Sequence, residues 1–173
     1  LVSGASKGEG LGNKFLAHIR EVDLICQVLR VFSDPSVVHV AGDVDWKRDK
    51  EIVETELILA DLQTLEKQPE PRMNADKEGL KRWELVTFLK EKLSQGRQAQ
   101  EVIIDEEDKQ VINQLQLLTM KSVLYVFNVS ETAVNTPIPD APNESLHISA
   151  KIESELASLP ADEQKAYLKE LGL

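Results

Sequence analysis

Two short polar motifs follow apolar runs in the last third of the chain. The apolar run 123–127 is typical of a buried strand, and an Asn and an acidic residue come directly after it. A second short strand is predicted to deliver a Ser-Ala-Lys motif further along. Open α/β domains bind nucleotides outside the carboxyl ends of parallel strands. The predicted nucleotide-binding residues are Asn128, Val129, Glu131, Ser149, Ala150 and Lys151.

These motifs resemble the base-recognition motifs of P-loop GTPases, which read Asn-Lys-x-Asp and Ser-Ala-Lys. Here Val129 replaces the Lys and Glu131 replaces the Asp. In the GTPase pattern the Asp accepts hydrogen bonds from guanine N1–H and from its 2-amino group. Adenine has an acceptor at N1 and no 2-amino group, so such a carboxylate would face an unpaired edge. The simpler alternative is that Asn128 and Glu131 end a strand and cap a turn.

The amino-terminal segment is spaced by glycines. From Gly4 to Asn13 it reads Gly-Ala-Ser-Lys-Gly-Glu-Gly-Leu-Gly-Asn, which closely resembles the switch II segment of the Obg-like ATPases, also called the YchF family. The resemblance covers nearly the whole chain. Further matching segments are Val38-His39-Val40-x-Gly42, Arg48-Asp49, Glu56–Asp61, Leu117–Thr119 and Glu170–Leu173.

This resemblance implies a fold and an activity. The fold is α/β: part of a P-loop NTPase G domain, with a doubly wound parallel sheet and an inserted antiparallel, coiled-coil-like helical arm. The implied parts are 1–54 (switch II onward), 55–118 (the helical insertion) and 119–173 (base recognition). The implied activity is Mg²⁺-dependent hydrolysis of ATP in preference to GTP, by a switch protein that acts with ribosomes or in translation.

The resemblance also implies roles for individual residues. Leu1 stands where Ras-type GTPases have the Gln that positions water, so another group must orient the water. His39 is the candidate, because a neutral imidazole could accept a proton from water; a structural histidine on a loop is the alternative. The switch II glycines are Gly4, Gly8, Gly10 and Gly12, and we expect the loop from Leu1 to Gly12 to be mobile.

The phosphate-binding loop Gly-x-x-x-x-Gly-Lys-Ser/Thr does not occur in the sequence. The switch Asp that the family uses near Mg²⁺ and the carboxy-terminal TGS domain do not occur either. We therefore expect a central fragment of a longer protein, or joined segments of one with seams near Gln68–Pro69 and Asn135. No residue present is predicted to bind metal, and this chain alone is expected neither to hydrolyse ATP nor to hold it tightly.

A dehydrogenase loop is a remote alternative for the first glycines. Gly4 to Gly10 fits the Thr-Gly-x-x-x-Gly-x-Gly loop of short-chain dehydrogenases, but that loop must follow a full buried strand. Only Leu1 and Val2 precede it. Those enzymes also need Tyr-x-x-x-Lys, and neither Tyr125 nor Tyr167 has a Lys four residues later.

The amino-acid composition limits the class of protein to which this chain can belong. The 173 residues are 42% hydrophobic and 29% charged, which is typical of a globular protein. No run approaches the roughly 18 apolar residues of a membrane span, and no signal peptide is recognisable, so we expect a cytoplasmic location without membrane contact. The single Cys26 excludes an intramolecular disulfide, and its apolar neighbours predict a buried strand thiol.

Charge is unevenly distributed along the chain. The net charge of −10 argues against a general affinity for nucleic acid. Between Lys67 and Arg97, however, eight basic residues accompany five acidic ones, so this segment is +3 and the remainder is −13. One interpretation is solvated helix faces with charges paired at i,i+4. The other is a basic prong that meets a ribosome or RNA, in which case the protein could serve as a non-catalytic binding module.

Hydrophobic periodicity and helix-capping residues predict the remaining elements. Asp105 is the expected N-cap of a helix whose Val111, Leu115 and Leu118 share a face. The other expected elements are a helix over 13–21, a strand over 24–32, a helix from about 47 that ends at Pro69–Pro71, a helix over 76–95, a loop over 133–142 and a last helix from Pro160.

Overall fold

The chain divides into two compact units in the computed structural model, which describes residues 4, 11–34, 43–73, 75–103 and 105–173. The helical unit comprises Leu1–Ile25 and Arg48–Val123, and the sheet unit comprises Cys26–Lys47 and Leu124–Leu173. The domain boundaries expected after residues 54 and 118 stay predictions.

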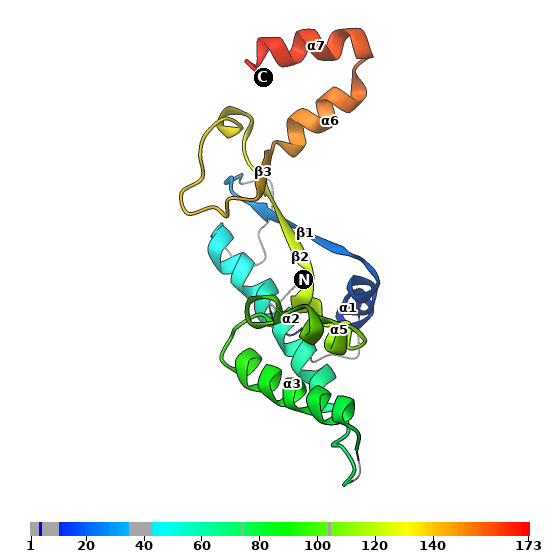
Figure 1. Ribbon diagram of the computed structural model, residues 1–173. Coiled ribbons are helices and arrows are strands. Elements are labelled where there is room, and N and C mark those ends of the chain that lie inside the picture. Colours follow the sequence, from blue (N-terminus) through cyan, green and yellow to red (C-terminus); the bar gives the residue numbers. More distant parts are fainter. Residues whose placement is uncertain (1–3, 5–10, 35–42, 74, 104) are drawn as a thin grey trace. The chain divides into compact units, whose positions relative to one another are not determined.

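The sheet has three strands in the order β1-β2-β3 (Figure 1). They are β1 (Leu24–Arg30), β2 (Ser122–Asn128) and β3 (Ser145–Ile148). Strands β2 and β3 are parallel, with Tyr125 opposite Ser145 and Asn128 opposite Ile148. The predicted α/β class with a parallel sheet is therefore confirmed. The short helices of this unit are η2 (Glu131–Ala133), α6 (Ala150–Ser158) and α7 (Ala161–Glu170).

The core of the sheet unit forms around Phe127, which is fully buried. Phe127 packs with Leu29 and Val129, and the ring of Trp46 meets it edge to face at a centroid distance of 5.1 Å. Aromatic rings prefer this geometry because the positive edge of one ring meets the negative face of the other. The core lies directly before the polar end of β2, and so it fixes where Asn128 projects.

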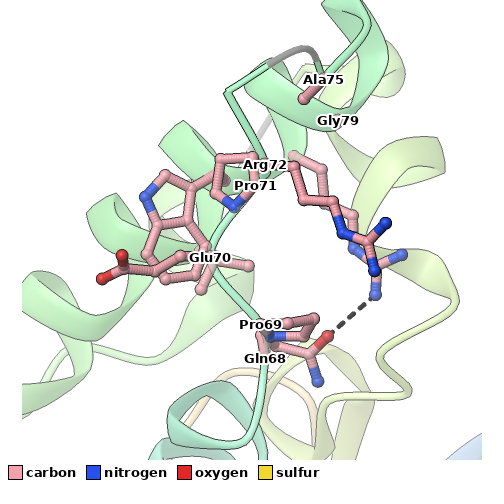
Figure 2. Close-up of a pocket in the computed structure, with 10 residues that line it drawn as sticks. Gln68, Pro69, Glu70, Pro71, Arg72, Ala75 and Gly79 are labelled. Atoms are coloured by element: carbon pink, nitrogen blue, oxygen red, sulfur yellow. Dashed lines mark hydrogen bonds between the residues drawn. The ribbon is translucent and has the colours of Figure 1, made fainter.

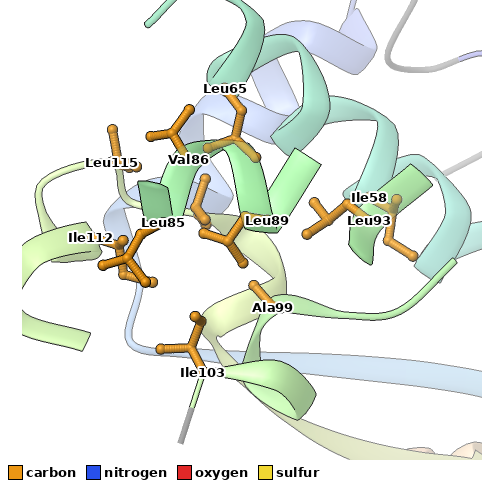
Figure 3. Close-up of a cluster of buried hydrophobic side chains, with 11 residues drawn as sticks. Ile58, Leu65, Leu85, Val86, Leu89, Leu93, Ala99, Ile103, Ile112 and Leu115 are labelled. Carbon is orange, nitrogen blue, oxygen red and sulfur yellow. The ribbon is translucent and has the colours of Figure 1, made fainter. Parts of the chain in front are cut away.

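The helical unit contains the remaining elements, except for Trp46 and Lys47, the first two residues of α2, which belong to the sheet unit. These elements are α1 (Leu11–Glu21), α2 (Trp46–Glu66), α3 (Lys77–Ser94), α4 (Ala99–Val102), α5 (Glu106–Asn113) and η1 (Leu118–Met120). Helix α2 ends before Pro69, and the chain turns back so that α3 packs against it. Figure 3 shows the buried cluster that joins these helices. Its members are Ile58, Leu65, Leu85, Val86, Leu89, Leu93, Ala99, Ile103, Ile112, Leu115 and Leu117.

Two helices begin at a capping aspartate. The Asp76 carboxylate accepts a hydrogen bond from the Gly79 N–H at 2.9 Å, and Asp105 accepts from the N–H groups of Glu107 and Asp108. A carboxylate at this position satisfies backbone donors that the first helical turn leaves unpaired. Asp105 was predicted to open a helix, and it does.

Three expectations about local structure are wrong. Helix α5 ends at Asn113, so Leu115 and Leu118 do not extend its face. Gln116 adopts a φ of 47°, which a continuing right-handed helix cannot accommodate. The switch loop was expected to extend to Gly12, yet α1 begins at Leu11. Cys26 is exposed rather than buried, because side chains alternate along β1 and the buried face carries Gln27 and Leu29.

Among the described helices, none combines the length and apolar character that a membrane crossing requires. Four predicted site residues lie outside the described residues, namely Leu1, Gly8, Gly10 and His39.

Candidate nucleotide-base site

The two predicted motifs meet where β2 and β3 end. The Asn128 side-chain oxygen accepts a hydrogen bond from the Ala150 N–H at 3.0 Å. The backbone continues this junction, because the Val129 N–H donates to the Ile148 carbonyl at 2.8 Å. Ser149 then caps α6, and its hydroxyl oxygen accepts from the Ile152 N–H at 3.5 Å. The structure thus brings the Asn motif and the Ser-Ala-Lys motif into direct contact.

The two charged members of the motifs form an ion pair. The Lys151 ammonium lies 2.5 Å from a Glu131 carboxylate oxygen, and both side chains are substantially exposed. Hydrogen bonding to Glu131, and then the charge of that carboxylate, raise the pKa of Lys151 above its usual value. The Glu131 carboxylate is therefore engaged by a cation from the neighbouring loop. Because the pair is open to solvent, its contribution to folding is small.

Val129 belongs to the same motif as Glu131, but its side chain is buried and not exposed. Its side chain is buried against Leu29 and Phe127, so it belongs to the core of the sheet unit. A Lys at this position would place a charge in that apolar environment, which is costly without a partner. The substitution of Val for Lys in the motif therefore fits the packing around it.

A second polar pair lies beside the ion pair, on α6 and α7. The Tyr167 hydroxyl donates a hydrogen bond to the Glu155 carboxylate, which raises the pKa of Tyr167. The charge of Glu155 also favours protonated Lys151, the residue four positions earlier. The sequence analysis missed Glu155 and Tyr167. The i,i+4 spacing of Lys151 and Glu155 is the signal that could have found the first of them.

Gly4 is the one switch II glycine with a described contact. Its N–H donates to the Glu56 carboxylate at 2.5 Å, and its φ of +85° lies in the left-handed region that glycine adopts without strain. Glu56 lies on α2 and is buried. This contact attaches Gly4 to α2.

A buried carboxylate on α2 was also missed by the sequence analysis. Asp61 is fully buried and accepts hydrogen bonds from the Leu118 N–H at 2.7 Å, the Thr119 N–H at 2.8 Å and the Thr119 hydroxyl at 2.7 Å. Burial raises the pKa of Asp61, and these hydrogen bonds oppose that shift. The segments 56–61 and 117–119 are thus joined by a structural network.

The described residues do not form a metal site. No group of three or more His, Cys, Asp or Glu side chains within the described ranges could hold a metal ion.

Comparison with known proteins identifies relatives over the whole chain, although no family model matches. "Ribosome-binding ATPase YchF" of Bacillus subtilis is 43% identical over 189 residues, covering 100% of this chain and 52% of that protein. Proteins of the same name from Haemophilus influenzae and Mycoplasma pneumoniae are each 39% identical and also cover 100% of this chain. The chain spans about half the length of these curated relatives.

A solved structure agrees with the sequence relatives. The YchF GTPase of Schizosaccharomyces pombe matches with a TM-score of 0.77 and 29% identity, over 96% of this chain and 50% of that one. The resemblance predicted from the glycine-spaced segment and the two base motifs is therefore confirmed by sequence and by fold. Over its whole length, the chain is therefore similar to proteins of the YchF family.

Proposed function

We propose that the protein is a nucleotide-binding switch ATPase of the YchF type, which binds ATP more tightly than GTP and acts on ribosomes in the cytoplasm. The observation that carries this proposal is the junction at the ends of β2 and β3, where Asn128 bonds Ala150 and Glu131 pairs with Lys151. The names of the relatives support ATP hydrolysis and ribosome binding for the family.

The hydrogen bonds of the junction favour adenine over guanine. Guanine presents an acceptor at O6 and donors at N1 and at its 2-amino group. The Ala150 N–H that could serve O6 already donates to Asn128, and the Glu131 carboxylate that could serve the donors is held by Lys151. Guanine would have to displace these partners or leave its own groups unpaired, and each of its donors or acceptors left unpaired would cost about 1–3 kcal/mol. Adenine makes no demand on a carboxylate.

Hydrolysis requires groups beyond this junction. Phosphoryl transfer depends on positioning and electrostatic stabilisation at the phosphates, and Mg²⁺ supplies charge neutralisation there when it is bound. From the resemblance, we propose His39 as the residue that orients the attacking water, with Leu1 as the hydrophobic substitute for the Gln of Ras-type GTPases. The described residues contribute base recognition at the ends of β2 and β3, and Gly4 is attached to α2 through Glu56.

The experiment that tests this function is a calorimetric titration of the full-length protein with ATP and GTP in the presence of Mg²⁺. We expect ATP to bind about ten-fold more tightly, which corresponds to about 1.4 kcal/mol. Equal or tighter binding of GTP would overturn the adenine assignment. A His39→Ala variant separates the roles further, since it should lower the rate of hydrolysis while leaving the ATP affinity unchanged.

A binding role without catalysis is the second candidate, and one observation favours it. The basic residues at the turn between α2 and α3 are exposed, among them Lys67, Arg72 and Lys77. If this end of the 67–97 segment contacts ribosomal phosphates, ribosome association must weaken as salt rises. Co-sedimentation with ribosomes over a salt series measures this, and association that is independent of salt would exclude phosphate contacts.

A further inference from the structure

The turn between α2 and α3 encloses a pocket that the proposed ATPase activity does not use (Figure 2). Its volume is about 390 Å³, within the range of sites that hold small ligands. We call it the turn pocket and define it by Pro69, Pro71, Arg72, Arg82 and Trp83. All five residues belong to the helical unit. The pocket therefore combines two guanidinium groups with an indole and two proline rings.

The polar part of the turn pocket is fixed by a hydrogen bond. An Arg82 Nη2 group donates to the Gln68 side-chain oxygen at 2.9 Å. This bond anchors one side of a guanidinium that carries five N–H donors in one plane. Figure 2 shows the carboxylate of Glu70 pointing to the side away from this bond. An anion at the guanidinium would thus avoid the acid of the same turn.

The aromatic part rests on the core of the helical unit. Trp83 is half-buried and packs against the buried cluster that joins α2 to α3, and Val86 lies in the pocket lining next to it. The Lys90 ammonium lies over the indole, 5.2 Å from the ring centre, so it adds positive potential at the ring and covers one of its two faces. A supported ring of this kind offers a flat surface for stacking at little cost in conformational freedom.

The charged side chains near the turn pocket differ in their pairing from those elsewhere on and beyond α3. On α3, Lys81 is paired with Glu107 and Asp108, and Lys92 with Glu91. Arg97 lies beyond α3 and faces Glu101 at 3.9 Å. Near the pocket, by contrast, Lys67 and Arg72 are exposed. Acids are exposed in the same stretch, namely Glu66, Glu70, Asp76 and Glu78, so an anionic ligand would depend on direct contact with the guanidinium groups of the pocket.

We propose that the turn pocket binds a nucleotide of single-stranded RNA, with its base stacked on Trp83 and its phosphate held by Arg72 and Arg82. Unpaired RNA bases stack on aromatic rings and guanidinium planes, and the planar donors of Arg match phosphate oxygens. An acidic peptide would use the guanidinium groups but would gain little from the indole face. This inference deepens the proposed function, because it names the ribosomal chemistry that the turn recognises.

The test is fluorescence anisotropy of the full-length protein with a labelled ten-nucleotide uridine RNA at several salt concentrations. Arg72→Gln should weaken binding about ten-fold, as expected for a charged hydrogen bond, and should reduce the slope of log affinity against log salt by about 0.7. Arg97→Gln is the matched control, because it removes the same charge from an exposed Arg outside the pocket. We expect it to change the affinity less than two-fold.

Two variants of the indole separate stacking from folding. Trp83→Leu should weaken RNA binding about ten-fold, whereas Trp83→Phe should retain most of it because a phenyl ring still stacks. Melting curves show whether each variant is folded. Equal losses for Arg72→Gln and Arg97→Gln, or for both Trp83 variants, would overturn the proposal, as would stronger binding of a glutamate decapeptide that Arg72→Gln abolishes. ATP binding and ribosome co-sedimentation by the wild type test the proposed function separately.

Discussion

Asp61 in the helical unit and Glu131 in the sheet unit are both carboxylates that bind groups far away in the sequence. Asp61 is fully buried and accepts three hydrogen bonds from Leu118 and Thr119. Glu131 is exposed and pairs with the ammonium of Lys151. The first carboxylate is satisfied by the fold alone, whereas the second remains accessible to a ligand.

Of these two carboxylates, Asp61 serves the stability of the fold and Glu131 is proposed to serve recognition of the nucleotide base. A buried carboxylate must keep its partners, because the desolvated charge has no water to replace them. An exposed ion pair can exchange its partner at small cost, since water solvates both charges. Changes at Asp61 should therefore act on folding, and changes at the end of β2 should act on nucleotide choice.

Removing the buried carboxylate is expected to have the largest effect. Asp61→Ala leaves two backbone N–H groups and the Thr119 hydroxyl without their acceptor, and each such loss costs about 1–3 kcal/mol. We expect the free energy of unfolding of the full-length protein to fall by about 3 kcal/mol or more, measured by urea denaturation. Glu131→Ala is the control and should change stability little. Equal destabilisation by the two variants would contradict the distinction.

The pH dependence of stability provides a second test of Asp61. Burial raises the pKa of Asp61 in the folded state, so the folded protein binds this proton more tightly than the unfolded chain does. Its contribution to stability is therefore largest at low pH, and it decreases as pH rises from the unfolded value through the raised folded value. Asp61→Asn should remove this decrease. The measurement is the difference in unfolding free energy between wild type and variant from pH 4 to pH 7; a difference that is constant across this range would show that Asp61 does not titrate as described.

Replacing Asn128 should affect both the stability of the protein and its affinity for ATP moderately. Asn128→Ala removes the acceptor of the Ala150 N–H, and a neutral hydrogen bond contributes about 1 kcal/mol. We expect a loss of stability of this size and a decrease in ATP affinity of up to about ten-fold, because the two base loops are no longer joined. Thermal melting and calorimetry measure the two effects. Unchanged ATP affinity in a folded variant would separate the junction from the base site.

Replacing Lys151 should have the smallest effect on the stability of the fold and a measurable effect on the preference between ATP and GTP. Lys151→Gln releases the Glu131 carboxylate while keeping a long polar side chain. Stability should be nearly unchanged, and GTP affinity should rise by a few-fold relative to ATP. Lys165→Gln, on α7 of the same unit, is the matched control for the loss of a positive charge. A rise in GTP affinity with both variants would indicate a general charge effect.

Local signals predicted much of this architecture. The apolar run that ends at Asn128 and the Ser-Ala-Lys motif indicated strand ends that meet, and Asp105 indicated a helix start. The end of α5 was missed because a residue with positive φ follows the helix there, and that residue is Gln116. Glycine, the residue that usually indicates a positive φ, is not at this position. The Asp61 network was missed for another reason: its partners lie 57 and 58 residues away, and only the tertiary fold brings them together.

The most direct test of the central claim is the base preference of a Glu131→Asp variant of the full-length protein. A shorter carboxylate should lose its contact with Lys151 and become available to guanine N1–H and the 2-amino group. We predict that the ratio of GTP to ATP affinity rises by about ten-fold in this variant, and that Glu155→Asp leaves it unchanged. An unaltered ratio in a folded, ATP-binding Glu131→Asp variant would contradict the assignment of base recognition to the ends of β2 and β3.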